Sequence, residues 1–223
     1  MNEVKTFLLS IDCSLRMTNA ALLAFTSSGY DVLSSERLDI GRAQAEELPL
    51  LCARILCKAG LTFADLSLLS VTSGPGYFTG LRIGAAYAAA LAYALGIKII
   101  PVPTLEMLAY PYMKDMYRPL ALAYAGRGRV YAASFCMGDD LPPGDYDKTS
   151  LEAWLEKPRD NLVVISDDPQ KVMDTLEKTA FPCAIQPSPP DAVNAGIVAI
   201  HRRAEALSPM NLRLSYLREP RTI

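Results

Sequence analysis

Three strand-like runs, over residues 5–12, 18–26 and 31–40, open the chain and are separated by short polar or glycine-containing connections. This pattern predicts an antiparallel meander. From Gln44 to Lys58 the apolar residues recur at three- and four-residue spacing, and Gly60 follows in the usual C-terminal cap region. The spacing predicts an amphipathic helix that ends there.

A strand, a glycine-rich turn and a second helix come next. The apolar segment 66–71 predicts a buried strand, and SGPGYFTGLRIG, Ser73 to Gly84, follows it directly. Residues 81–95 form helices readily and lead through Gly96 into a β-branched strand at 97–102. The order is typical of an RNase-H-like domain, the half-unit of the actin-like ATPase and sugar-kinase architecture. We therefore expect an α/β fold of this class with an N-terminal lobe at residues 1–104.

The second half is less regular, and residues 105–223 are expected to form a smaller C-terminal lobe. The pattern predicts strands near 120–124, 130–137 and 161–166, and helices at 150–156, 170–178 and 192–207. The Pro/Gly/Asp-rich stretch 138–147 interrupts these elements, and the prolines at 188–190 predict a loop.

Composition narrows the class of protein. The 223 residues are 51% hydrophobic, enough to bury a core, and carry a formal charge of -2, which argues against binding RNA alone. The five cysteines form no CxxC pair, so we expect reduced, buried thiols in a cytosolic protein. Near the N-terminus Asp12 ends the apolar run from Phe7 too early for a signal peptide or a membrane span. A soluble, cytoplasmic protein without a membrane partner is expected.

The glycine-rich turn has two interpretations. Its glycines, including Gly74 and Gly76, allow backbone N–H groups to face a phosphate or another backbone to approach closely. The segment lacks the Gly-Lys-Ser/Thr of a P-loop and is not GxGxxG. A structural turn and a ligand or partner site both remain open.

The helix after the turn is rich in alanine around nearly its whole circumference. It is therefore either central in the core or pressed against another chain. In the second case it forms a helical interface together with the helix at 44–58. The expected contact residues are Leu48, Leu51, Cys52, Ile55, Leu81, Arg82, Ala85 and Ala89.

Few other residues are candidates for a catalytic, metal-binding or RNA-binding site. Asp12 and Ser14 end a strand, where a carboxylate can hold a metal-bound water or orient a nucleophile, or where both residues can simply satisfy turn hydrogen bonds. His201 is the single histidine, which nearly excludes a histidine-based metal centre. Five arginines near the C-terminus predict a solvated basic face, with contact to an acidic partner or RNA as the alternative: Arg202, Arg203, Arg213, Arg218 and Arg221.

Several of these motifs together resemble the TsaB (YeaZ) family of tRNA threonylcarbamoyladenosine biosynthesis proteins, which is grouped with the M22 glycoprotease-like proteins. The resemblance rests on IDCS at 11–14, ELP at 47–49, AGL at 59–61 and above all on SGPGYFTGLRIG. It implies an actin-like fold of two lobes, of which the C-terminal one is degenerate, without a catalytic centre, metal or cofactor of its own. ATP or ADP and metal are expected on the partners.

The resemblance also implies partners. In the family this subunit pairs with the catalytic paralogue TsaD, supports the ATPase TsaE, and forms a homodimer when alone. TsaD transfers a threonylcarbamoyl group to adenosine in tRNAs that read codons beginning with A, so tRNA is met only through the complex. TsaD holds its metal with two histidines on the helix corresponding to 44–58, which has none here.

The chain departs from the family pattern at Cys13, at Ala43 to Ala45, at Tyr77, and at Tyr124 to Gly126, where the family has an Asp-Ala-Arg element. Two other functions are alternatives to this one. An ATP-dependent small-molecule kinase would use Asp12, but the second half offers only Ser166, Asp167 and Asp168 in place of a second phosphate loop. A peptidase is disfavoured because metal-ligand histidines are lacking.

Overall fold

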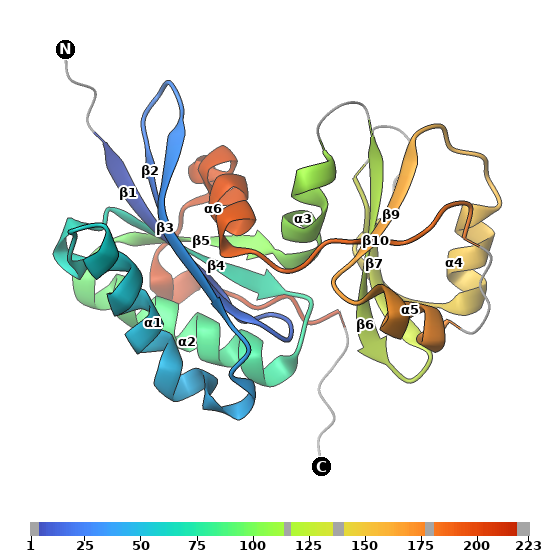
Figure 1. Ribbon diagram of the computed structural model, residues 1–223, viewed down its shortest axis with the longest axis horizontal. Helices are drawn as coiled ribbons and strands as arrows, with labels where there is room; N and C mark the ends of the chain where they lie inside the picture. The colour runs from blue at the N-terminus through green and yellow to red at the C-terminus, as the bar shows by residue number, and fades with distance from the viewer. Residues whose placement is uncertain (1–4, 114–116, 136–140, 177–180, 218–223) are drawn as a thin grey trace. The chain divides into compact units, whose positions relative to one another are not determined.

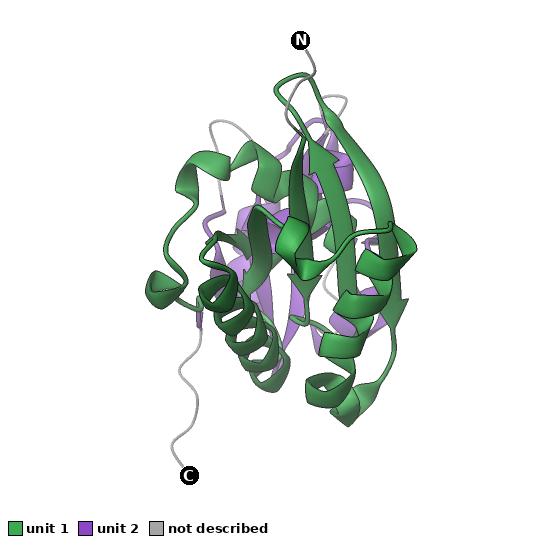
Figure 2. Ribbon diagram, turned by 90° about the vertical axis from the view of Figure 1, so that its left-hand side faces the viewer, with its two compact units in different colours: residues 1–104, 190–215 green, residues 105–189, 216–223 purple. Residues whose placement is uncertain are grey.

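The computed structural model describes residues 5–113, 117–135, 141–176 and 181–217. They form two compact units, one of residues 1–104 and 190–215 and the other of residues 105–189 and 216–223 (Figure 2). The predicted second lobe, residues 105–223, is therefore too long at its C-terminal end, because residues 190–215 belong to the first unit.

The first unit is a five-stranded sheet in the order β3-β2-β1-β4-β5, covered on both faces by helices (Figure 1). Strands β1 to β3 form the predicted antiparallel meander, and β4 and β5 pair parallel to β1 and to each other. Its elements are β1 (Thr6–Asp12), β2 (Thr18–Phe25), β3 (Tyr30–Leu38), α1 (Gln44–Lys58), β4 (Leu68–Gly74), α2 (Phe78–Leu95), β5 (Lys98–Pro103) and α6 (Ala192–His201).

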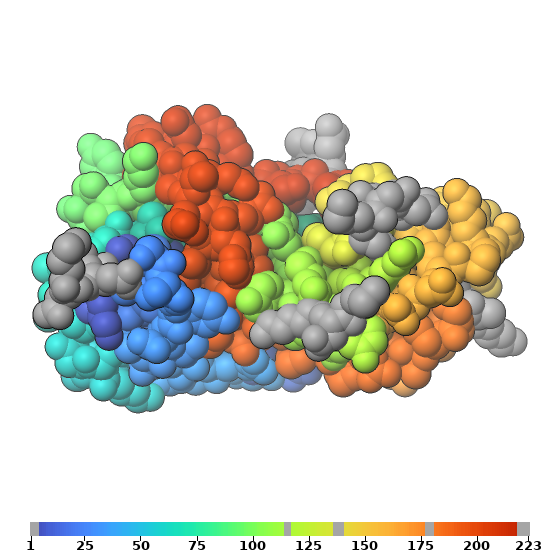
Figure 3. Space-filling view, turned by 90° about the horizontal axis from the view of Figure 1, so that it is seen from above, coloured from blue at the N-terminus to red at the C-terminus, as the bar shows by residue number. Residues whose placement is uncertain are grey.

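Successive side chains along each strand point to opposite faces of the sheet. Leu9, Ile11, Leu69 and Val71 point into the core that α1 and α2 cover. Ser10, on the opposite face of β1, lies against Gly196 of α6. Figure 3 shows the red segment that contains α6 beside the blue β2–β3 strands, in agreement with its packing on β2.

The second unit repeats the sheet order of the first. Its antiparallel strands β8-β7-β6 continue into β9 and β10, which run parallel to β6. This matches β3-β2-β1-β4-β5, as expected of the actin-like architecture. Its elements are α3 (Thr104–Ala109), β6 (Arg118–Gly126), β7 (Arg129–Ser134), β8 (Gly144–Asp147), α4 (Lys148–Leu155), β9 (Leu162–Ser166), α5 (Pro169–Thr175) and β10 (Gln186–Pro187).

Three sequence predictions need correction. The stretch 138–147 contains β8, which pairs with β7 although its sequence is rich in turn residues. The helix expected at 192–207 ends at His201, because Leu207 exchanges two backbone hydrogen bonds with Ile99 of β5. The short strand β10 and helix α3 had no counterpart in the prediction. The predicted ends at Met137 and Lys178 lie outside the described residues.

Candidate functional site

The glycine-rich turn is packed against the chain's own backbone. A methyl group on Gly76 would overlap the carbonyl oxygen of Ser14, and one on Gly80 would overlap that of Cys13. Gly74 has a φ of +115°, and a side chain there would meet the carbonyl oxygen of Ser215. These positions require glycine because backbones cross there. The geometry favours a structural joint over a phosphate cradle.

Hydrogen bonds hold this joint from both sides. The Tyr77 N–H donates to the Ser14 carbonyl at 2.7 Å, and the Ser215 N–H donates to the Ser73 carbonyl at 2.7 Å. The loop after β1 and the C-terminal segment therefore both fix the start of α2. The ring of Tyr77, a departure from the family pattern, stays about one third exposed at 36%.

Asp12 is fully buried at the end of β1. Its Oδ1 atom accepts bonds from the Ser14 N–H at 3.0 Å, the Ser14 hydroxyl at 2.6 Å and the Thr72 hydroxyl at 2.7 Å. Its Oδ2 atom accepts one from Asn19 Nδ2 at 2.9 Å. A carboxylate with four donors is already satisfied. The arrangement agrees with the interpretation of Asp12 and Ser14 as turn-stabilising residues.

The same network continues towards α6. Asn19 Oδ1 accepts a bond from Arg37 Nε at 3.1 Å, and Arg37 Nη2 reaches Asp191 Oδ2 at 3.3 Å. Asp191 caps α6, since its Oδ1 accepts the Val193 N–H at 2.8 Å. Polar residues thus connect the end of β1 to the helix on the second face of the sheet.

Most of the expected interface residues belong to this chain's own core. Six side chains are at most 8% exposed and cannot contact a partner: Leu48, Leu51, Cys52, Ile55, Leu81 and Ala85. The physical reason is that the apolar periodicity of a helix marks the face that covers its own sheet. Arg82 is exposed and Ala89 half-buried, so these two remain on the outer side.

The outer faces of α1 and α2 carry other residues that the periodicity did not select. On α1 these are Glu46, Leu50, Ala53 and Cys57, and on α2 they are Arg82, Ala86, Ala90 and Tyr93. Leu50 is 54% and Tyr93 71% exposed. The signal available in the sequence was an apolar residue placed off the core stripe. We call these eight residues the outer helical face.

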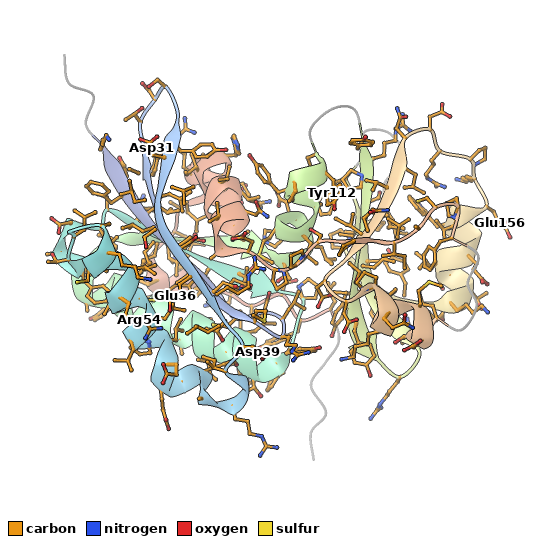
Figure 4. The ribbon with its side chains drawn as sticks, in the orientation of Figure 1. Asp31, Glu36, Asp39, Arg54, Tyr112 and Glu156 are labelled. Atoms are coloured by element: carbon orange, nitrogen blue, oxygen red, sulfur yellow. The ribbon has the colours of Figure 1, made fainter. Side chains whose placement is uncertain are left out.

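Ion pairs fix α1 to the sheet. The Glu36 carboxylate on β3 accepts bonds from Arg54 Nη2 and Lys58 Nζ, both at 2.9 Å, and Figure 4 shows Glu36 and Arg54 side by side. Bonds from Lys58, then from Arg54, lower the pKa of Glu36. These ion pairs connect the C-terminal half of α1 to β3.

The thiols differ in accessibility. Burial raises the pKa of Cys52 to about 12 and also raises that of Cys13, which the charge of Asp12 raises further. Both thiols are therefore protonated and unreactive. Cys57 is exposed and Cys183 half-buried, unlike the buried state expected, and Cys136 lies outside the described residues.

The C-terminal basic residues are largely engaged locally. Arg202 pairs with Glu205 at 2.7 Å, and the guanidinium groups of Arg203 and Arg213 donate to nearby backbone carbonyls. His201 is the last residue of α6. Within the described ranges, no three His, Cys, Asp or Glu side chains converge as a metal site would require. Arg218 and Arg221 lie outside those ranges.

Two loops of the second unit contain the remaining candidates. Tyr124 lies beneath Lys171, whose Nζ is 4.1 Å from the ring centroid. Gly126 ends β6 and Arg127 begins the β6–β7 turn, both with positive φ angles. Asp168 caps α5 by accepting the Lys171 N–H at 3.1 Å. The neighbouring Asp167 Oδ1 is buried and finds no hydrogen-bond donor among the described residues. Nothing in this loop resembles a glycine-rich phosphate site.

Helix α2 also meets the length and hydropathy expected of a membrane span, with a mean hydropathy of 1.3 over 18 residues. A core helix of a water-soluble protein passes the same test, and one face of α2 covers the sheet. The helix is therefore weak support for a membrane location.

Comparison with known proteins places the chain in a family. The model for TsaD, tRNA N6-adenosine threonylcarbamoyltransferase, matches residues 39–160, more than half of the chain. An uncharacterized protein of Mycobacterium tuberculosis is 34% identical over 191 residues, 85% of this chain and 82% of that protein. The TsaB protein of Buchnera aphidicola is 28% identical over 127 residues, 56% of this chain and 53% of that protein.

Solved structures show the same fold. YeaZ from Pseudomonas aeruginosa superposes with a TM-score of 0.72 at 22% identity, covering 95% of this chain and all of that one. Another Pseudomonas aeruginosa structure, of an uncharacterized protein similar to the peptidase YeaZ, gives a TM-score of 0.76 at 20% identity over 96% of this chain. Because its model matches more than half of the chain, these findings show that the chain belongs to the TsaD family of tRNA threonylcarbamoyladenosine biosynthesis proteins, and that it has the fold of YeaZ.

Proposed function

We propose that this chain is an accessory subunit in N6-threonylcarbamoyladenosine formation, next to the anticodon of tRNAs that read codons beginning with A. It pairs with a TsaD-type catalytic subunit, supports a TsaE-type ATPase, and has no catalytic centre, metal or nucleotide of its own. Alone it forms a homodimer, and it meets tRNA only through the complex. It acts in the cytoplasm.

The outer helical face carries this proposal. Leu50 and Tyr93 expose more than half of their side-chain area, and Ala53, Ala86 and Ala90 add small exposed residues on the two adjacent helices. Small residues allow another helix to approach closely, and exposed apolar side chains gain free energy when a partner covers them. The face therefore suits a helical partner better than solvent.

The buried network around Asp12 supports a role without catalysis. Its two carboxylate oxygens already accept four hydrogen bonds, so serving as a base or holding a metal-bound water would require breaking buried bonds. A carboxylate that is already satisfied disfavours the kinase alternative. Calorimetry of the isolated chain with ATP and Mg²⁺ tests the kinase alternative, because tight binding of ATP would favour it.

The decisive test is association with the TsaD-type subunit of the same organism. Ala86→Arg places a charged, bulky side chain at the centre of the outer helical face and should abolish co-purification. Ala153→Arg introduces the same side chain at an exposed alanine of α4, in the second unit, and should bind like the unchanged protein. If the unchanged chain stays monomeric and ignores both the TsaD-type and TsaE-type proteins, the proposal is wrong.

A further inference from the structure

A hollow of about 640 Å³ opens where α1 and α2 begin. The β1–β2 loop, the connection from β3 to α1 and the first turns of α2 enclose it, and Figure 4 labels Asp39 at its edge. We call it the arginine hollow and define it by the lining residues that matter here: Leu15, Arg16, Asp39, Arg42, Tyr77 and Ile83.

The inside of the arginine hollow is apolar. Leu15 is buried, Ile83 is half-buried, and the Tyr77 ring is 36% exposed. Gly80 also lines the hollow, between the start of α2 and the loop after β1. The hollow can therefore receive an apolar side chain from outside.

Its rim carries an excess of positive charge. The Arg16 guanidinium pairs with Asp39, with Nε at 3.1 Å and Nη2 at 2.7 Å from Oδ2. Arg42 is exposed and forms no ion pair within the part of the chain that the structure describes. Two arginines and one carboxylate thus line the hollow, on a chain whose formal charge is -2. The local charge at the rim is therefore positive, whereas the net charge of the whole chain is negative.

The rim continues into the outer helical face. Phe78 is 37% exposed, and the Arg82 guanidinium lies 3.8 Å from the centroid of its ring. Exposed aromatic residues beside arginines are enriched in the parts of protein interfaces that contribute most binding energy. This continuity favours a protein segment over a small molecule.

We propose that the arginine hollow receives an acidic segment of the TsaD-type partner. One apolar side chain of that segment fills the space between Leu15 and Ile83, while a carboxylate beside it pairs with Arg42. Guanidinium groups bind carboxylates through two parallel hydrogen bonds, which would fix the register of the segment. This inference rests on the proposed function and names a second contact of the same interface.

Charge variants test the inference by titration calorimetry with the TsaD-type subunit. Arg42→Glu should weaken binding about tenfold at low ionic strength, and the loss should shrink as salt is added, because a charge at a rim acts through screened electrostatics. Asp39→Asn removes the carboxylate that lines the hollow and should strengthen binding. The opposite directions distinguish charge complementarity from damage to the fold.

Cross-linking identifies the occupant. A photo-reactive phenylalanine analogue in place of Thr79, which is exposed and lines the hollow, should cross-link to a peptide of the TsaD-type subunit that contains Asp or Glu. Cross-links only to tRNA or to a second copy of this chain would overturn the inference, and so would the absence of a cross-link in the assembled complex.

The failures of the two proposals are distinguishable. If Ala86→Arg abolishes association while Arg42→Glu and Asp39→Asn bind like the unchanged chain, the arginine hollow has no role and the proposed function stands. A loss with Arg42→Glu that does not depend on salt also contradicts the hollow. If the unchanged chain does not associate at all, the proposed function fails, and the inference fails with it.

Discussion

The hydroxyl of Thr72 donates a hydrogen bond of 2.7 Å to the carboxylate of Asp12, joining the ends of two parallel strands that lie 60 residues apart in the chain. Ser14 and Asn19 bind the same carboxylate, so the loop after β1 and the start of β2 depend on it too. Asp12 is therefore a structural centre of the first unit, placed where its fold class can also place a catalytic acid.

Replacing Asp12 by Ala should destabilise the protein by about 3 kcal/mol, because the buried donors of Ser14, Thr72 and Asn19 lose a charged acceptor. Urea unfolding followed by circular dichroism measures the loss. Asp31→Ala, on the exposed β2–β3 hairpin, is the control and should unfold like the unchanged protein. Unchanged stability with loss of tRNA modification would instead assign Asp12 a catalytic role.

Gly76→Ala should destabilise by about 2–3 kcal/mol, because the added methyl group overlaps the Ser14 carbonyl and forces two backbone segments apart. Gly29→Ala is a matched control, since nothing lies within 4 Å of a methyl group at that position. Thermal unfolding of the two variants should differ clearly. Equal melting temperatures would mean that the turn is not packed as described.

The stability of the second unit should depend on Asp167. Burial, and then the charge of Asp168, raise the pKa of Asp167 from 3.8 to about 6. A carboxyl whose pKa is raised on folding binds its proton more tightly in the folded state, so the protein loses stability as the pH rises from about 4 through about 6.

Asp167→Asn removes this penalty. It should stabilise the protein near neutral pH by at most about 3 kcal/mol, and the gain should vanish towards the acidic end of that range. Unfolding free energies measured across the range provide the test. Parallel curves for the variant and the unchanged protein would show that the carboxyl is solvated in the folded state.

Thiol labelling should separate the cysteines. Cys57 is exposed and should react quickly with a thiol reagent, whereas Cys13 and Cys52 should react only on unfolding because they are buried with raised pKa values. Mass spectrometry after brief labelling gives the rates. Rapid labelling of Cys52 in the folded protein would contradict the packing of α1.

The same measurement tests the proposed interface. Cys57 belongs to the outer helical face, so the TsaD-type subunit should slow its labelling once the complex forms. Cys183 in the second unit is the internal reference. Its rate should stay the same with and without the partner.

The sequence by itself determined the local elements of the first unit. The helix Gln44–Lys58 has the predicted bounds, because its apolar spacing and Gly60 are local signals. The meander, the strand before the glycine-rich turn and the helix after it also follow from local pattern, within a few residues at each end. The family motif was equally local, since SGPGYFTGLRIG is one continuous segment.

Only the tertiary structure decided which helix faces are buried, which are exposed, and which C-terminal residues pack on the first unit. Apolar periodicity predicts a buried face but cannot say whether the chain's own sheet or a partner covers it, and for Leu48, Leu51, Cys52 and Ile55 it is the sheet. Local propensity extended the last helix to Leu207, while pairing with Ile99, about a hundred residues earlier, ended it at His201. Contacts distant in sequence leave no periodic signal, so only the folded chain places α6 on the first unit and opens the hollow beside Arg42.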